Sequence, residues 1–444
     1  MPHTGRSLFG AHWERIMKAI KGIFVLSTVL FSAHTLALPF MAYDPRTLGM
    51  GGTSVSAANS TTAALYNPAL LSAANKDDDF SITLPTLGVR VADADELAQA
   101  VTDFNDADYV GKFDAATDTT SDPDRFNPIL PGPVPNPNFA ANVTNAISAA
   151  QNVLTGIQTL SNKTIEAQIG AGTLISIPSR NFGFALVASG TLGGGVVGDV
   201  TAEDLAQINA QIAELEAALI GSTAPDLTLF DPNAMTTNIQ ARFGLIQEYG
   251  LAISKEYEIG EADYAFGITP KVVKMQTIDY KLVGSALDQA DINIETGLTE
   301  YSDFNLDFGV AHNYNDEYRA GLVIKNLIPK SYKTVLGNTI KVNPAVRIGG
   351  SMHGAAYNVA ADLDLTENDP LGLGGKSRYL SLGTELDLWL LKVQLGYRYN
   401  ISDSDASIMT AGLGLNLGLD VEVAGAMNPS GNEYGVAARV GFSF

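Results

Sequence analysis

The chain of 444 residues contains no cysteine, and only 17% of its residues are charged. The absence of cysteine excludes a disulfide scaffold and a thiolate-bound metal. Basic residues are also scarce, 27 against 48 acidic ones, and the net charge of −21 argues against nucleic acid as a partner. Beyond the first forty residues no run of about 18 apolar residues occurs, which excludes a helical membrane bundle. With 46% apolar residues, the remaining classes are a large soluble protein and a β-barrel membrane protein.

Residues 1–37 have the layout of a secretory signal peptide. A short basic start at Met17 precedes an apolar run over 22–31, and small residues lead to a cleavage site after Ala37. The run is too short to span a bilayer, and the alternative is a buried core strand or helix. Met17 is a second candidate for the true start beside Met1. A secreted chain without cysteine indicates a bacterial envelope.

The second half of the chain alternates between apolar and other residues, as in 392–399 and 434–444. The polar rows hold mainly Gly, Ala, Ser, Asn and isolated charges, whereas the polar face of a soluble sandwich is usually rich in Lys, Glu and Thr. Apolar and aromatic residues outside, with small and polar residues inside, are what a lipid-facing barrel requires. Closure of the sheet also removes its edges. The alternation therefore favours a transmembrane barrel, and the soluble sandwich is the alternative.

The pattern predicts an antiparallel transmembrane β-barrel of about fourteen strands, and a count of twelve also fits. The expected strands are 78–91, 162–178, 181–198, 237–255, 261–279, 299–312, 316–327, 340–352, 355–366, 377–388, 391–400, 406–417, 419–427 and 433–444. The odd connections are long and the even ones tight. This arrangement predicts an outer-membrane protein of a Gram-negative bacterium, surrounded by outer-membrane lipid, with both termini periplasmic.

Two segments of the long loops have helical spacing, 138–160 and 201–219. Both carry an apolar face, including Ile212 and Leu215 in the second. These faces either cap the barrel mouth and form an apolar recess, or they pack on each other. The sequence leaves both interpretations open.

The segments 48–56 (LGMGGTSVS) and 65–72 (LYNPALLS) resemble the N-terminal signature of fatty-acid-transporter-type (FadL-type) outer-membrane proteins. The continuation over 77–89 and 93–97 is closer to the conjugal-transfer TraF-like family of outer-membrane barrels. The resemblance is specific over about residues 40–100. After the predicted signal peptide over 1–37, it implies a hatch over 38–76 that folds inside the lumen and a barrel over 77–444.

The resemblance assigns five residues to the hatch: Gly51, Gly52, Asn67, Pro68 and Ala69. A lumen of fourteen strands is too wide for side chains alone to fill, which is a physical reason for a hatch. The alternative for Asn67 and Pro68 is an ordinary turn on the periplasmic surface. At the other end of the chain, Phe442 and Phe444 resemble the signal that the barrel-assembly machinery reads, which makes that machinery an expected partner.

Residues that could carry chemistry are scarce. The run 193–198 matches G-x-G-x-x-G but lies in a predicted strand, so a dinucleotide site is not expected. His312 and His353 fall near predicted periplasmic turns, and no flanking pattern supplies a catalytic triad. We therefore expect no enzyme, no catalytic residue, no cofactor and no metal.

Arg319, Arg398 and Arg439 lie on the polar rows of their strands and are expected to point into the lumen. A guanidinium there would attract the carboxylate of a fatty acid through paired hydrogen bonds. The alternative is structural pairing with carboxylates of the same rows, such as Glu385, Asp387 and Glu422.

Two classes of function follow. The first is a hatch-gated channel for small hydrophobic compounds. The second is a structural or accessory barrel that docks proteins of a conjugal transfer or secretion apparatus. A lateral break in the wall would favour the channel, and Pro270 and Pro344 are candidates because proline removes a ladder hydrogen bond.

Overall fold

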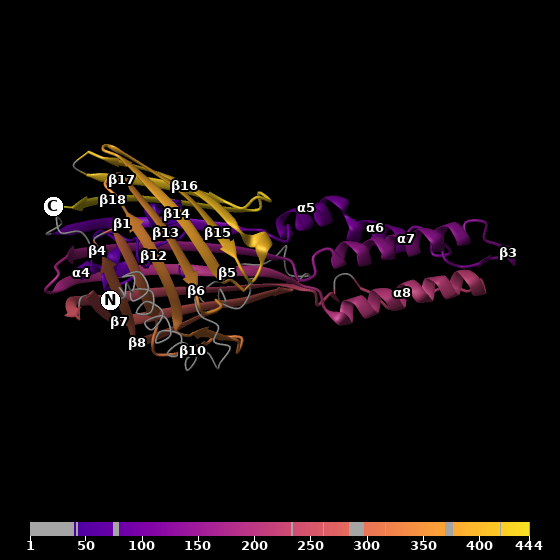
Figure 1. Cartoon of the computed structure of the whole chain (residues 1–444). Helices are drawn as coiled ribbons and strands as arrows, with labels where there is room; N and C mark the ends of the chain where they lie inside the picture. The colour runs from indigo at the N-terminus through magenta and orange to yellow at the C-terminus, as the bar shows by residue number, and fades with distance from the viewer. Residues whose placement is uncertain are drawn as a thin grey trace, which may run out of the picture.

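The computed structural model describes residues 40, 43–73, 80–231, 234–260, 262–283, 297–315, 317–368, 376–417 and 419–443. Within them, fourteen strands close into one antiparallel barrel (Figure 1), and the predicted architecture is confirmed. Strand β1 pairs with both β18 and β4, which closes the sheet. The barrel strands are β1 (Ser81–Ala92), β4 (Thr164–Ile177), β5 (Gly183–Asp199), β6 (Asn238–Ile259), β7 (Ala262–Val283), β8 (Leu298–Tyr314), β9 (Tyr318–Lys325), β12 (Ala345–His353), β13 (Tyr357–Asp364), β14 (Tyr379–Leu388), β15 (Leu391–Asn400), β16 (Ile408–Asn416), β17 (Asp420–Met427) and β18 (Glu433–Ser443).

The wall is inverted relative to a soluble sheet, with apolar side chains outside and polar ones inside. On β18, Tyr434 and Val436 are 55% and 61% exposed, whereas the inward Arg439 is 2% exposed. On β15, Leu395 is 55% exposed and the inward Gln394 only 1%. An apolar outer band over the whole wall is stable only in contact with hydrocarbon, which marks a barrel of the outer-membrane type. No helix among the described residues is both long and apolar enough to span a bilayer.

One predicted strand was wrong at its start. The alternation over 340–352 belongs to two elements, the end of a loop hairpin and the barrel strand β12. The hairpin, β10 (Lys330–Lys333) with β11 (Thr339–Val342), pairs only within itself. Pro344 separates it from β12, because proline has no N–H to donate. Pro344 thus lies outside the barrel wall and does not break it.

Pro270, by contrast, lies inside β7. The register between β6 and β7 is recorded up to Gly250 and Lys271 and resumes at Ile253 and Ile268, so pairing with β6 is interrupted beside the proline. Pairing of Pro270 with Leu306 of β8 continues. The interruption is therefore local: it affects the pairing of β7 with β6, while the pairing of β7 with β8 keeps the wall closed.

The connections alternate in length as the sequence indicates. At one end of the barrel the strands join through turns such as 354–356 and 389–390. At the other end they join through loops such as 93–163 and the described part of 200–237. The long loops hold four helices and a small hairpin. These elements are α5 (Leu97–Ala107), α6 (Tyr109–Thr117), β2 (Ile129–Leu130), β3 (Val134–Pro135), α7 (Phe139–Gln158) and α8 (Ala202–Gly221). We call residues 93–163 and 200–237 the helical arm.

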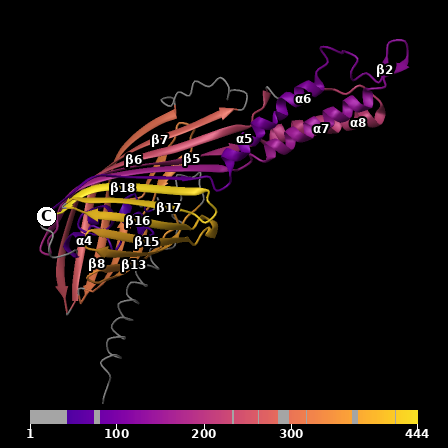
Figure 2. The ribbon, with the colours of Figure 1, turned by 90° about the horizontal axis from the view of Figure 1, so that it is seen from above.

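The helical arm projects away from the barrel in both views, and the C-terminus lies at the opposite end (Figures 1 and 2). The apolar faces of its helices pack on each other. Val153 and Ile157 of α7 share one cluster with Ile208 and Ile212 of α8, and Leu215 lies in a second cluster nearer the tip. The structure thus shows that the two apolar faces pack on each other, which is the second of the two interpretations.

Residues Tyr43–Ala73, which precede β1, lie inside the barrel and are called here the luminal segment. The segment includes α2 (Pro45–Gly49), α3 (Ala63–Tyr66) and α4 (Leu70–Ala73). Nearly all of its residues are buried, and it contacts strands on every side of the barrel. The predicted signal peptide over 1–37, part of the predicted hatch and Phe444 lie outside the described residues. Phe442 lies in β18, paired with Ile82.

Candidate functional site

The luminal segment begins with a capped helical turn. The Thr47 N–H donates to the Asp44 carboxylate at 2.9 Å, which caps α2, and Pro45 occupies its first turn. Gly51 and Gly52, assigned to the hatch from sequence, follow α2 with φ of +67° and +88°. Residues other than glycine rarely adopt this backbone conformation. The two glycines therefore permit the turn that directs the segment back across the lumen.

Glycines of the wall face the luminal segment where its backbone comes closest. A Cβ on Gly396 would lie 2.1 Å from the Gly51 nitrogen, and one on Gly309 would lie 2.0 Å from Oδ1 of Asn67. The other wall glycines whose missing Cβ would overlap the segment are Gly88, Gly170, Gly172, Gly183, Gly267, Gly321 and Gly383. The small residues that the sequence places on the inner rows therefore make room for this segment.

Asn67 of the predicted Asn67-Pro68-Ala69 motif makes hydrogen bonds both within the luminal segment and to the barrel wall. The Asn67 amide donates to the carbonyl oxygen of Val55 at 2.8 Å and to that of Val310 at 3.3 Å. Its Oδ1 accepts the Ala69 N–H at 3.1 Å. Asn67 is fully buried, and these contacts place it inside the lumen beside β8.

Buried ion pairs join the luminal segment to the wall. Arg46 donates through Nε and Nη2 to Glu385 of β14 at 2.9 to 3.1 Å, and its Nη1 donates to the Ala57 carbonyl at 2.7 Å. Arg439 of β18 lies between Asp44 of the segment, 3.3 Å away, and Glu422 of β17, 2.9 Å away. These charges are removed from water and compensate each other, and the Arg46–Glu385 and Arg439–Asp44 pairs depend on the seated position of the segment.

One further wall carboxylate and one wall arginine bind the backbone of the segment. Asp362 accepts the N–H groups of Ser54 and Val55 at 2.7 and 3.0 Å. Arg347 pairs with Asp364 at 2.6 Å and donates to the Gly52 carbonyl at 3.1 Å. Sequence reasoning missed these residues and Arg46. Their inward positions could be read from strand alternation, but their partners lie hundreds of residues away.

The three arginines proposed from sequence all point inward, and their surroundings differ. Arg439 is enclosed by its two carboxylates. Arg319 donates to Asn313 at 2.7 Å and to the Ser56 carbonyl at 3.2 Å. Arg398 donates to the Phe40 carbonyl at 3.2 Å and stacks on the Tyr379 ring, 3.9 Å from its centroid. Among the described residues, Nε of Arg398 has no partner although the side chain is buried.

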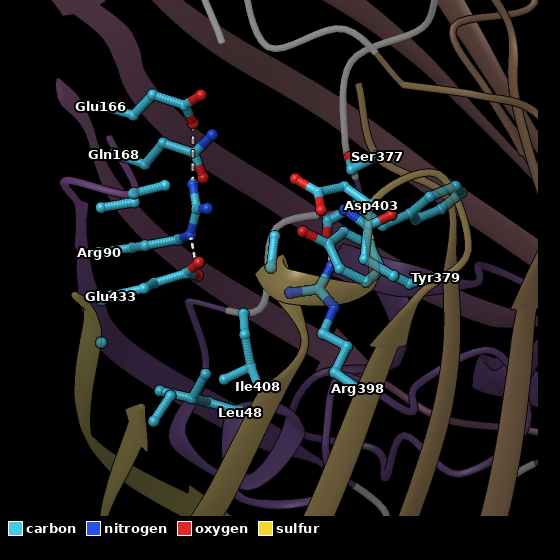
Figure 3. Close-up of a pocket in the computed structure, with 18 of the residues that line it drawn as sticks. Leu48, Arg90, Glu166, Gln168, Ser377, Tyr379, Arg398, Asp403, Ile408 and Glu433 are labelled. Atoms are coloured by element: carbon cyan, nitrogen blue, oxygen red, sulfur yellow. Dashed lines mark hydrogen bonds and ion pairs between the residues drawn. The ribbon is translucent and has the colours of Figure 1, made fainter. Parts of the chain in front are cut away.

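Arg398 lines a cavity of about 190 Å³ at the arm end of the barrel (Figure 3). On the opposite side of the cavity, Arg90 pairs with Glu433 at 2.5 Å and with Glu166 at 3.3 Å, so its charge is already compensated. Leu48 and Ile408 contribute apolar surface between the two arginines. The cavity therefore combines apolar surface with the buried guanidinium of Arg398, for which no ion pair is found among the described residues.

The histidines do not form a recognisable catalytic centre within the described residues. Nε2 of His353 lies 2.8 Å from Oγ of Ser351, two residues back on the same inward row, and that hydroxyl also donates to the Ser56 carbonyl at 3.1 Å. His312 stacks on Tyr264. No described carboxylate is hydrogen-bonded to His353, and no described group of three His, Asp or Glu could hold a metal ion.

The fold and this interior define a class: a membrane β-barrel whose lumen is occupied by its own N-terminal segment. A family model described as "F plasmid transfer operon, TraF, protein" matches residues 64–364, and the chain belongs to that family. No curated protein matches the chain at a significant level.

Solved structures similar to the chain include a toluene transporter and a FadL homologue. The toluene transporter TodX of Pseudomonas putida is 12% identical, with a TM-score of 0.46, over 92% of this chain and 99% of that one. A FadL homologue of Pseudomonas aeruginosa is 8% identical, with a TM-score of 0.43, over 90% of this chain and 97% of that one.

Proposed function

We propose that this protein is an outer-membrane channel for small hydrophobic compounds and that the luminal segment is its hatch. The proposal is based on two features that occur together: the lumen is occupied, and a cavity lies at its mouth. The lining of this cavity includes Leu48, Ile408 and Arg398. A hydrophobic compound gains free energy by leaving water for such a recess. It reaches the other side only when the segment shifts.

The cavity suits a compound of about one aromatic ring. An engineered protein cavity of about 150 Å³ binds benzene, so a volume of about 190 Å³ accommodates a ring with a small substituent. The guanidinium of Arg398 favours a compound that carries a carboxylate, because that carboxylate would compensate a buried charge that has no ion pair among the described residues.

We also propose an orientation. Bacterial barrels have short periplasmic turns and long outer loops, so the end with the short turns and the C-terminus would be periplasmic. The helical arm would then lie outside the cell. The accessory-barrel function remains the second candidate, and the arm is the observation that favours it.

Replacing Arg398 by Met is expected to slow benzoate uptake roughly tenfold and to leave toluene uptake within about twofold. The change removes the donor for a carboxylate and keeps an apolar side chain of similar length. Uptake of both labelled compounds is measured in cells that lack the native protein and express each variant. Arg398→Lys is the matched control because it keeps the charge. Equal losses for benzoate and toluene would contradict a carboxylate contact at this residue.

A reversible tether tests whether the segment must move. Oγ of Ser72 in α4 lies 2.6 Å from Oγ of Ser254 in β6, close enough for a disulfide between cysteines at these positions. Because the chain has no other cysteine, the bridge in Ser72→Cys/Ser254→Cys would be unique. Under oxidising conditions we expect toluene uptake to fall to the level of cells without the protein, and a reductant should restore it.

The matched control joins two strands of the wall. Oγ of Ser81 in β1 and Oγ of Ser176 in β4 are also 2.6 Å apart. Oxidised Ser81→Cys/Ser176→Cys is expected to transport as the reduced form does, since neighbouring strands need not separate. If cells lacking the whole protein take up alkanes, aromatics and fatty acids as fast as wild type, the channel function fails.

A further inference from the structure

The helical arm has its own apolar core and a fixed base. At the base, the Asp204 carboxylate accepts the N–H groups of Thr236 and Thr237. Burial acts to raise the pKa of Asp204, but these hydrogen bonds outweigh it and hold the pKa below its ordinary value. On the other loop, Lys163 donates to the Asp95 carbonyl. The arm therefore presents its surface in a defined position rather than as a loose loop.

The charged residues of the arm are mostly acidic. Its two segments hold sixteen acidic and three basic residues, a net charge of −13. Twelve of the acidic side chains are exposed, and Lys112 is the one exposed basic residue among the described residues of the arm. Arg125 is held by the carbonyl oxygens of Ala115 and Asp118. The exposed carboxylates thus have almost no cations nearby on the arm.

The far end of the arm exposes large apolar side chains. Ile129 and Val134, in the hairpin of β2 and β3, are 56% and 53% exposed, and Ile220 at the end of α8 is 87% exposed. The hairpin and this end of α8 lie at the tip (Figures 1 and 2). The core of the tip is formed by other residues, including Phe139 and Leu215, so these exposed side chains are not needed for it.

We propose that the helical arm is a docking surface for a cationic protein, with the acidic flanks attracting the partner and the apolar tip anchoring it. Charge complementarity selects this occupant. The arm repels nucleic acid, anionic lipid and a second copy of itself, and a basic protein surface is the macromolecular surface that it attracts. An apolar patch within polar surroundings is the usual composition of a protein interface. The proposal does not depend on transport through the barrel.

Two synthetic peptides of equal charge serve as probes, one with seven lysines and three leucines and one with three serines in place of the leucines. Binding of each labelled peptide to the full chain in nanodiscs of zwitterionic lipid is measured by fluorescence anisotropy, with empty nanodiscs as the blank. We expect the leucine peptide to bind roughly fivefold more tightly than the serine peptide. Both affinities should fall as salt is raised.

Two triple variants with equal loss of charge locate the binding. The arm variant is Asp106→Asn/Glu203→Gln/Glu216→Gln, and the barrel variant is Glu258→Gln/Glu317→Gln/Asp405→Asn; all six side chains are exposed. We expect the arm variant to bind both peptides roughly tenfold more weakly and the barrel variant to bind as wild type does. Equal weakening in both variants would overturn the proposal, because binding would then follow overall charge.

The tip is tested by Val134→Ser/Ile220→Ser. This variant should remove the advantage of the leucine peptide and leave the affinity for the serine peptide unchanged. Heat-modifiable migration and the helical signal in circular dichroism verify that barrel and arm are folded. If wild type binds the two peptides equally, the tip is no anchor and the proposal fails.

Discussion

Deleting residues 43–73 is expected to raise the single-channel conductance at least about tenfold. The wall closes through its own strand pairs, so a barrel without the luminal segment should still assemble. Larger barrels leave an aqueous channel unless something fills them, and here the segment fills the lumen. Inward charges such as Glu385 and Arg347 would then face water, which solvates them. The measurement is conductance in planar bilayers, with the two ends of the deletion joined by a short Gly-Ser linker.

The matched control removes a piece of the arm instead. Replacing residues 128–136, the tip hairpin, by a short linker leaves the lumen filled and should leave the conductance unchanged. Heat-modifiable migration of both deletions in gels verifies the folded barrel. An unchanged conductance for the deletion of 43–73 would show that the lumen is closed by other parts of the chain, and the hatch function would be lost.

Replacing Arg46 by Ala is expected to weaken the seating of the luminal segment by about 3–5 kcal/mol. The change leaves the Glu385 carboxylate buried without its guanidinium, while the barrel strands keep their pairing. The free energy is therefore expected to appear as undocking of the segment rather than as unfolding. Brief channel openings and faster proteolysis within 43–73 are the two measurements.

Two further variants test whether the effect comes from the ion pair between the segment and the wall. The exchange Arg46→Glu/Glu385→Arg restores an ion pair and should recover part of the seating. Lys271→Met is the matched control, because Lys271 pairs with Glu248 and Asp307 of the wall, 2.6 and 2.8 Å away, and no partner recorded for it lies in the segment. Lys271→Met should not increase openings. If Lys271→Met and Arg46→Ala have the same effect, loss of wall stability explains both.

The strands could be read from the sequence because their signal is local. A period of two, such as that over 391–400, depends only on which side of the wall each residue faces, and most predicted strands lie within a few residues of the observed ones. The pattern over 340–352 was misread because the loop strand β11 and the barrel strand β12 alternate in the same way. Helical spacing likewise predicted α7 and α8 but could not decide what their apolar faces contact.

By itself, then, the sequence determined the barrel, its inward and outward rows and the segment before the first strand. The tertiary structure alone decided which inward charges are compensated. Arg398 and Arg439 give the same signal in sequence, an arginine on a polar row. Yet Arg439 lies between Asp44 and Glu422, while Arg398, beside a cavity, has no ion pair among the described residues. The difference depends on where the luminal segment seats. Contacts between residues more than 300 positions apart set that position, and no local pattern encodes them.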